Sequence, residues 1–168
     1  MLSLAPLQSA DLDDIVAAFR ALGWGGKDRA QYERYLGEQS QGTRTVLLAR
    51  WDGVFAGYVT VQWLSEYEPI AAANIPEVAD FNVLPAFRRR RIGSALMDEA
   101  ERRIAARSPI AGIGVGLHHD YGAAQRLYVL RGYVPDARGI TAHGARMNWG
   151  DSAKIDDDLV LWLTKPLS

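Results

Sequence analysis

The chain has 168 residues with a net charge of −1, and 48% of its residues are hydrophobic and 23% charged. This length suits one domain that buries its own core, so we expect residues 1–168 to form a single domain. The chain has no cysteine, which excludes disulfides, thiolate metal sites and a cysteine nucleophile. Near-neutral charge gives no bias toward nucleic acid or membrane, and no apolar run approaches the roughly 20 residues of a membrane span. We therefore expect a soluble, cytoplasmic protein.

The first third of the chain alternates strand and helix patterns. Residues 2–7 are short and apolar and predict a strand. Ser9 is a suitable N-cap for a helix that continues to about Leu22, because apolar residues follow it at helical spacing. Glycines on both sides of Trp24 end that helix, and residues 28–38 predict a second, weaker one.

The middle of the chain predicts an antiparallel hairpin. Residues 45–50 and 54–63 are β-rich and flank an Asp-Gly pair, which is a strong hairpin signal. Residues 66–76 contain two prolines and predict a loop. Residues 77–84 then predict a strand that ends at Pro85.

The second half again alternates helix and strand. Residues 92–107 predict a helix, with Glu99 and Arg103 as a favourable i,i+4 pair. Residues 110–117 predict a strand, and 121–131 a helix closed by Gly132. Tyr133 and Val134 are candidates for the start of another strand. Residues 136–157 are glycine-rich and weakly patterned, whereas 159–164 predict a last strand. Interleaved helices and strands with one hairpin indicate a mixed α/β sheet.

The segment from Val83 to the start of the next helix predicts a phosphate site. The first turn of a helix has N–H groups without intrahelical partners and a partial positive charge, and both suit a pyrophosphate. Gly93 lacks a Cβ where an anion would approach the backbone. Four arginines add positive charge at this point and could reach further phosphates. They are Arg88, Arg89, Arg90 and Arg91.

This segment resembles the cofactor motif of the GCN5-related N-acetyltransferase (GNAT) superfamily, Arg/Gln-x-x-Gly-x-Gly/Ala. Arg88, Ile92 and Gly93 fit the motif. Arg91 stands where the motif has its first glycine. We expect the backbone of Arg91 to stay at negative φ, where a side chain is tolerated.

A second segment is similar to another motif of the family, Asn-x-x-Ala-x-x-Leu-Tyr-x-x-x-Gly-Phe. Here the segment spans residues 121–133. Ala124, Leu127, Tyr128 and Gly132 agree with the motif, while Tyr121 replaces its asparagine and Tyr133 its phenylalanine. The two motifs stand in the expected order and on the expected elements.

The resemblance implies a GNAT fold, a mixed and mostly antiparallel sheet of six to seven strands with about four helices. It also implies acetyl-CoA as co-substrate, with no metal. Coenzyme A would lie between the splayed parallel strands that precede and follow the cofactor helix. The implied reaction is direct attack of a primary amine on the acetyl group in a ternary complex, without a covalent enzyme intermediate.

The resemblance also implies roles for individual residues. Tyr128 would donate a proton to the departing thiolate. Glu77 matches the position of the base in the histone-acetylating branch, and Asp80, on the opposite face of the strand by period two, is the alternative. A backbone N–H near residues 81–83 would polarise the acetyl carbonyl. The implied cofactor-binding residues are Phe81, Asn82, Val83, Arg88, Arg89, Arg90, Arg91, Ile92, Gly93, Ser94, Tyr121 and Tyr128.

Several alternatives stay open at this point. The chain could bind acyl-CoA as a sensor or interaction module without turnover, and the arginine run could bind nucleic acid, although the net charge of −1 argues against this. Neighbours on a strand point to opposite faces, so His118 and His119 predict no metal site. Trp24 and Trp63 are candidate walls of an acceptor pocket. The acceptor is a small-molecule or peptide amine, and relatives are often homodimers.

Overall fold

The computed structural model describes residues 1–167, and among these it has eight strands and five α-helices. The mixed α/β class is confirmed, and both counts are slightly higher than expected. Contacts divide the chain into two compact units. The first comprises residues 1–63 and 78–103, and the second comprises residues 64–77 and the chain from Ile104 onward. None of the helices in the described part is long and apolar enough to cross a bilayer.

The first unit is built on four strands in the order β1-β2-β3-β4. β1 (Leu2–Pro6), β2 (Arg44–Trp51) and β3 (Val54–Gln62) pair antiparallel, and β4 (Glu77–Val83) follows them. The predicted hairpin between β2 and β3 is confirmed. Asp52 and Gly53 have φ of 49° and 82°, the two left-handed residues of a tight hairpin turn.

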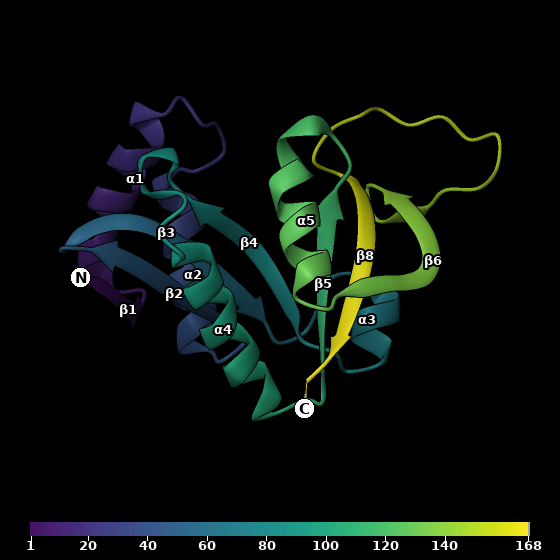
Figure 1. Ribbon diagram of the computed structural model, residues 1–168, viewed down its shortest axis with the longest axis horizontal. Helices are drawn as coiled ribbons and strands as arrows, with labels where there is room; N and C mark the ends of the chain where they lie inside the picture. The colour runs from purple at the N-terminus through teal and green to yellow at the C-terminus, as the bar shows by residue number, and fades with distance from the viewer. Residues whose placement is uncertain (168) are drawn as a thin grey trace. The chain divides into compact units, whose positions relative to one another are not determined.

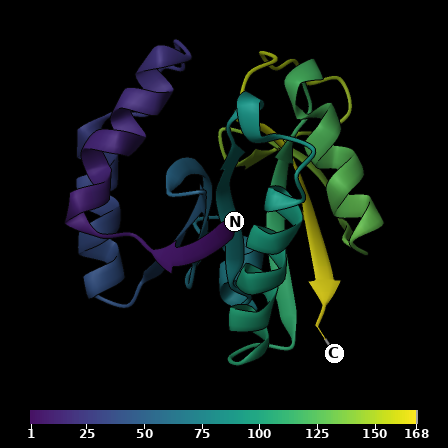
Figure 2. The same cartoon turned by 60° about the vertical axis from the view of Figure 1, so that its left-hand side comes forward.

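Two helices of this unit run alongside each other, α1 (Leu12–Ala21) and α2 (Arg29–Ser40) (Figure 2). The prediction that Ser9 caps the first helix is wrong. Ser9 lies inside a 3₁₀ turn that precedes α1, and the Asp11 carboxylate accepts the bond from the Gln8 N–H at 2.8 Å. Asp28 caps α2 by accepting a bond from the Gln31 N–H at 2.9 Å.

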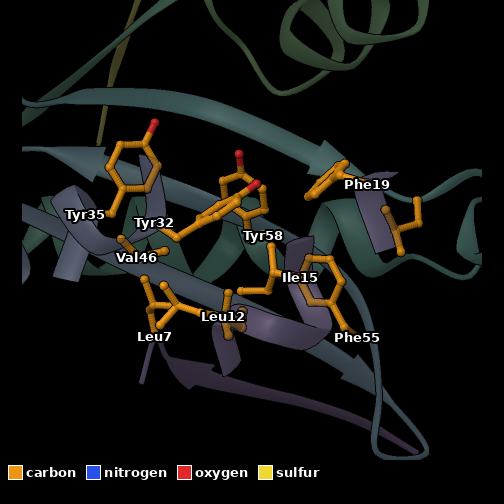
Figure 3. Close-up of a cluster of buried hydrophobic side chains, with 11 residues drawn as sticks. Leu7, Leu12, Ile15, Phe19, Tyr32, Tyr35, Val46, Phe55 and Tyr58 are labelled. Carbon is orange, nitrogen blue, oxygen red and sulfur yellow. The ribbon is translucent and has the colours of Figure 1, made fainter. Parts of the chain in front are cut away.

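The core of the first unit is aromatic on one side (Figure 3). Its three tyrosines, Tyr32, Tyr35 and Tyr58, are buried with their hydroxyl groups on the same side of the cluster. Buried tyrosine hydroxyls usually need a polar partner, so this arrangement points to a polar group above the rings. The cluster consists of Leu7, Leu12, Ile15, Phe19, Tyr32, Tyr35, Val46, Leu48, Phe55, Tyr58 and Leu84.

The helix that follows β4 is α4 (Ile92–Ala105), as predicted from its apolar stripe. Ile92, Leu96 and Ala100 are at most 1% exposed, so this stripe is the buried face. The predicted Glu99–Arg103 pair is present, with Nε 2.8 Å from Oε1, and the guanidinium of Arg102 joins it.

The second unit contains β5 (Ile110–Gly116), β8 (Leu159–Pro166), β6 (Val134–Ala142) and β7 (Ala145–Arg146), in that order. Figure 1 shows β8, in yellow, between β5 and β6. The helix α5 (Gly122–Leu130) ends before Gly132, whose φ of 89° confirms it as the residue that closes the helix.

The sequence placed the start of a strand at Tyr133 and Val134, where β6 begins, but it missed the rest of β6, all of β7 and one short helix. The stretch 136–157 holds most of β6 and all of β7, which the glycine-rich pattern concealed. A register shift between Pro135 and Ile140 interrupts the regular alternation of a strand there. The predicted loop 66–76 contains the five-residue helix α3 (Glu68–Ala72), too short to show a helical repeat.

Candidate functional site

The loop between β4 and α4 holds the four consecutive arginines. Pro85 starts a 3₁₀ turn, closed by a bond from the Phe87 N–H to the Leu84 carbonyl at 2.9 Å, and the chain then turns into α4. Arg88 donates from Nε to the Val83 carbonyl at 3.2 Å. The guanidinium of Arg90 lies 5.2 Å from the ring centre of Trp51 and 5.7 Å from that of Phe87. All four arginines are exposed, so the loop presents positive charge to solvent.

The expectation of negative φ at Arg91 is wrong. Arg91 has φ of 60° and Arg89 has φ of 63°, both in the left-handed region. A side chain in this region crowds its own backbone, at a cost of about 1–2 kcal/mol per residue. The loop therefore keeps the conformation that a glycine would favour, although arginine occupies the position.

The first turn of α4 begins where the sequence placed it. The Ala95 N–H donates to the Arg91 carbonyl at 3.0 Å, so the N–H groups of the preceding residues in that turn have no intrahelical partner. The structure gives Gly93 a packing role as well. A Cβ there would lie 3.1 Å from Phe81 Cζ and 3.6 Å from Val83 Cγ2, so the glycine lets the helix approach β4 closely.

Asp80, on β4, is the centre of a polar cluster. Its carboxylate pairs with the Lys27 ammonium and accepts a bond from the Tyr58 hydroxyl. It also accepts bonds from the Tyr35 hydroxyl at 2.9 Å, from Gln31 Nε2 at 2.8 Å and from Asn82 Nδ2 at 2.8 Å. The Tyr35 and Tyr58 hydroxyls are two of the three that Figure 3 shows on one side of the core, whereas the buried Tyr32 hydroxyl has no hydrogen-bond partner among the described residues.

The cluster fixes the charge of Asp80. Burial alone would raise the pKa of its carboxyl group, but the positive charge and hydrogen bond of Lys27, followed by the bonds from Tyr58 and Tyr35, lower the pKa below its ordinary value. Burial also raises the pKa of Tyr58 well above its ordinary value, so its hydroxyl stays a donor. A carboxylate with this many donors holds its negative charge firmly and is a weak proton acceptor.

The backbone at Asp80 is irregular. Its φ of 44° is left-handed, which is unusual for a strand residue other than glycine. From Asp80 to Val83 the side chains nevertheless alternate between two neighbourhoods. Asp80 and Asn82 contact each other, whereas Phe81 and Val83 lie toward Gly93.

Glu77, in the second unit, has its carboxylate hydrogen-bonded to a hydroxyl group. Its carboxylate accepts a bond from the Ser65 hydroxyl at 2.5 Å, and the same hydroxyl accepts one from the Tyr67 N–H at 3.0 Å. Glu77 is half-buried. Its carboxylate has a hydroxyl neighbour, in contrast to the ammonium that pairs with Asp80.

The two tyrosines of the second motif differ in their surroundings. Tyr128 is 5% exposed on α5, and burial, followed by the charge of Tyr121, raises the pKa of its hydroxyl well above the ordinary value. Tyr121 donates from its hydroxyl to Asp157 at 3.1 Å, and its ring lies against Gly116, where a Cβ would be 2.4 Å from the ring.

His118 and the two candidate tryptophans, Trp24 and Trp63, each have different contacts. His118 Nε2 lies 2.9 Å from Asp157 Oδ1. Trp63 donates from Nε1 to Thr45 Oγ1 at 3.1 Å, whereas the ring of Trp24 lies 5.6 Å from that of Phe19, beside the aromatic core. Within residues 1–167, one group has donor atoms placed so that they could hold a metal ion, and it is His143, Asp156 and Asp158.

Sequence reasoning singled out Asp80 but missed its partners. Lys27, Gln31, Tyr35 and Tyr58 are separated from Asp80 by 22 to 53 residues, and no motif connects them. The one available signal was Lys27 itself, one of only three lysines in the chain and placed directly after the glycines around Trp24.

A family model described as the acetyltransferase (GNAT) family matches residues 11–133 of this chain. No curated protein matches the chain in sequence. Several solved structures match its fold over almost the whole length. One is an acetyltransferase of the GNAT family from Streptococcus pneumoniae, with 19% identity, a TM-score of 0.68 and 99% of each chain covered.

Two further structures show the same fold. A ribosomal-protein-alanine N-acetyltransferase from Brucella melitensis has 18% identity and a TM-score of 0.69, with 98% of this chain and 99% of that chain covered. The PaiA N-acetyltransferase from Thermoplasma acidophilum, solved in complex with coenzyme A, has 12% identity and a TM-score of 0.67, with coverage of 96% and 98%. At these identities the likeness concerns the fold.

Proposed function

This chain belongs to the acetyltransferase (GNAT) family, and on that premise we propose that it transfers an acetyl group from acetyl-CoA to a primary amine. The observation that carries the proposal is the loop from β4 into α4. Its left-handed residues Arg89 and Arg91, its exposed arginines and the free N–H groups of the first helical turn make a concentrated anion-binding surface. A pyrophosphate fits this chemistry, and coenzyme A carries one.

The arginines of this loop divide into two pairs in the proposed site. Arg88 and Arg90 are held by contacts to the Val83 carbonyl and to the Trp51 ring, which fix the shape of the loop. Among the described residues, the guanidinium groups of Arg89 and Arg91 form no hydrogen bond or ion pair, and both side chains are exposed. We assign the phosphate contacts to Arg89, Arg91 and the N–H groups of Ile92, Gly93 and Ser94, with Phe81, Asn82 and Val83 beside the acetyl end.

The amine must lose a proton before it attacks, and the two candidate carboxylates differ in how readily they accept a proton. Asp80 pairs with an ammonium and accepts four further hydrogen bonds, from Tyr58, Tyr35, Gln31 and Asn82, and its pKa is lowered. Glu77 has a hydroxyl partner in Ser65. We assign proton removal to Glu77, directly or through water, and leave Asp80 as a fixed negative charge.

The departing thiolate needs a proton in return. Burial raises the pKa of Tyr128, so its hydroxyl is protonated throughout the neutral range and available as a donor. The N–H groups near Phe81 and Val83 are assigned to the developing charge on the acetyl oxygen. The proposed reaction uses these groups without a metal, and we propose that it takes place in the cytoplasm.

The experiment that tests the proposal measures release of coenzyme A thiol from acetyl-CoA. The full chain is assayed with a panel of primary amines, namely alkyl monoamines, diamines, an amino acid and a peptide with a free N-terminus. The expected result is amine-dependent thiol release that falls in the Tyr128→Phe variant but not in Tyr133→Phe, a neighbouring buried tyrosine. Binding of acetyl-CoA with no thiol release for any amine would instead establish a sensor.

A further inference from the structure

The ammonium of Lys27 lies in a cage made by the first unit. It pairs with the Asp80 carboxylate and donates to the Tyr58 hydroxyl at 2.9 Å. The ring centres of Phe19 and Tyr58 lie 6.0 and 5.5 Å from its Nζ. A carboxylate, a hydroxyl acceptor and two aromatic rings are the groups that recognise an alkylammonium ion in general.

The cage does not depend on Lys27 for its shape. The Asp80 carboxylate is also fixed by Tyr35, Gln31 and Asn82, at 2.9, 2.8 and 2.8 Å. Tyr58 and Phe19 are fully buried, each at 0% exposure. Removal of the lysine would therefore leave an ordered, negatively charged pocket that lacks its cation.

Lys27 lies on a glycine-containing segment whose backbone can change conformation. It lies between α1 and α2, directly after Gly25 and Gly26, and Gly26 has φ of 73°. Its side chain is 19% exposed and that of Asp80 is 18% exposed, so the pair is open to solvent at one side. An ammonium from solution can thus compete for the same carboxylate.

The charge of the cage decides which amine it holds. Asp80 favours the protonated form of its partner, because the same contact that lowers the pKa of a carboxyl group stabilises the ammonium. An ammonium has no lone pair and cannot attack an acetyl group. A cage of this kind therefore binds the amine of the acceptor that does not react.

We infer that the Asp80–Tyr58–Phe19 cage binds the distal ammonium of a linear diamine or polyamine acceptor, and that Lys27 occupies the cage until the acceptor displaces it. This inference rests on the proposed function and names its substrate class. Asp80 lies one to three residues from Phe81–Val83, the segment assigned to the acetyl end, and this separation spans about 3–10 Å along a strand. The separation of the two nitrogens across four or five methylenes falls within this range.

The first arm of the test measures binding without turnover. The full chain without coenzyme A is titrated with 1,5-diaminopentane, and Lys27→Met is compared with the unmodified chain. Lys27→Met keeps the length of the stem and removes the ammonium, so the apparent affinity is expected to rise about tenfold once the internal competitor is gone. Lys154→Met is the matched control, because Lys154 is 81% exposed and far from the cage in sequence, and it is expected to change nothing.

The second arm measures thiol release. We expect the diamine to have at least a tenfold higher kcat/KM than 1-aminopentane, a lower KM for the diamine in Lys27→Met, and loss of the diamine preference in Asp80→Asn. Lys27→Gln, which can still hydrogen-bond to Asp80, serves as a second variant should Lys27→Met fail to fold. It is expected to shift the KM in the same direction.

The outcomes separate the two proposals. Thiol release with equal efficiency for diamine and monoamine, together with an unchanged diamine affinity in the lysine variants, overturns the cage and leaves the transferase standing. Tighter diamine binding in Lys27→Met without thiol release for any amine supports the cage and overturns the transferase. Lower stability of both lysine variants with no gain in diamine affinity assigns Lys27 a purely structural role and also overturns the inference.

Discussion

Gly57 of β3 is the position at which the first unit tolerates a side chain least. A Cβ built there lies 2.3 Å from the Asn82 carbonyl oxygen, whereas ordinary contact begins at 3.4 Å, so the two backbones must separate by about 1 Å. Both groups belong to strands, and the neighbouring bond from the Leu84 N–H to the Ala56 carbonyl, at 2.9 Å, holds those strands together. We expect Gly57→Ala to lower the free energy of unfolding by about 3 kcal/mol, the upper end for overpacking.

The assay is urea unfolding, with the same substitution at Gly37 as the matched control. Gly37 lies within α2, and a Cβ there meets nothing within 4 Å. Gly37→Ala is expected to raise the free energy of unfolding by about 0.5–1 kcal/mol, because alanine loses less backbone entropy in a helix. A loss below about 1 kcal/mol for Gly57→Ala would refute the reasoning, since a clash with a fixed backbone oxygen must cost more than that.

Three further predictions concern the loop, the pH dependence and the proton donor. Arg91→Gly is expected to raise the free energy of unfolding in urea by about 1 kcal/mol, because φ is 60° there. Arg88→Gly, at φ of −64°, is expected to lower it. Equal effects of the two substitutions would contradict backbone strain at Arg91. Hydrogen bonds from Arg102, against burial, lower the pKa of Glu99 to about 2. The stabilisation by Glu99 is therefore full above its unfolded pKa near 4.5 and is lost as the pH falls through 2. Glu99→Gln is expected to cost less than about 1 kcal/mol at pH 7 and only a small part of that at pH 2, as measured by unfolding at both pH values. An unchanged difference would refute the pairing. Tyr128→Phe is expected to lower thiol release about 100-fold, and full activity in that variant would exclude it as the acid.

Local signals predicted much of the fold. The Asp-Gly pair fixed the turn between β2 and β3, and the apolar stripe that includes Ile92 placed α4. The sequence could not reveal that Arg91 adopts a left-handed conformation, because arginine has no intrinsic preference for one. The sequence indicated where β6 starts but concealed its continuation, since the irregular register between Pro135 and Ile140 removes the alternation by which a strand is recognised.

The residues of the candidate site also differ in how far the sequence could predict them. The loop from Val83 to Gly93 is continuous in sequence, so its motif could be read directly. The cluster around Asp80 is assembled by tertiary packing, because Lys27, Tyr35 and Tyr58 come from three separate elements. Such a cluster has no spacing to recognise, and only the folded chain brings it together.

The alternation of side chains along β4 has a consequence for how this protein can change during evolution. From Asp80 onward, successive residues of β4 face two different neighbourhoods. Asp80 and Asn82 meet the polar cluster, while Phe81 and Val83 meet Gly93. Substitutions at 80 and 82 can therefore alter what the polar side recognises while the packing beneath α4 stays intact. Substitutions on this one strand can thus change which molecule is bound without changing the packing of the fold.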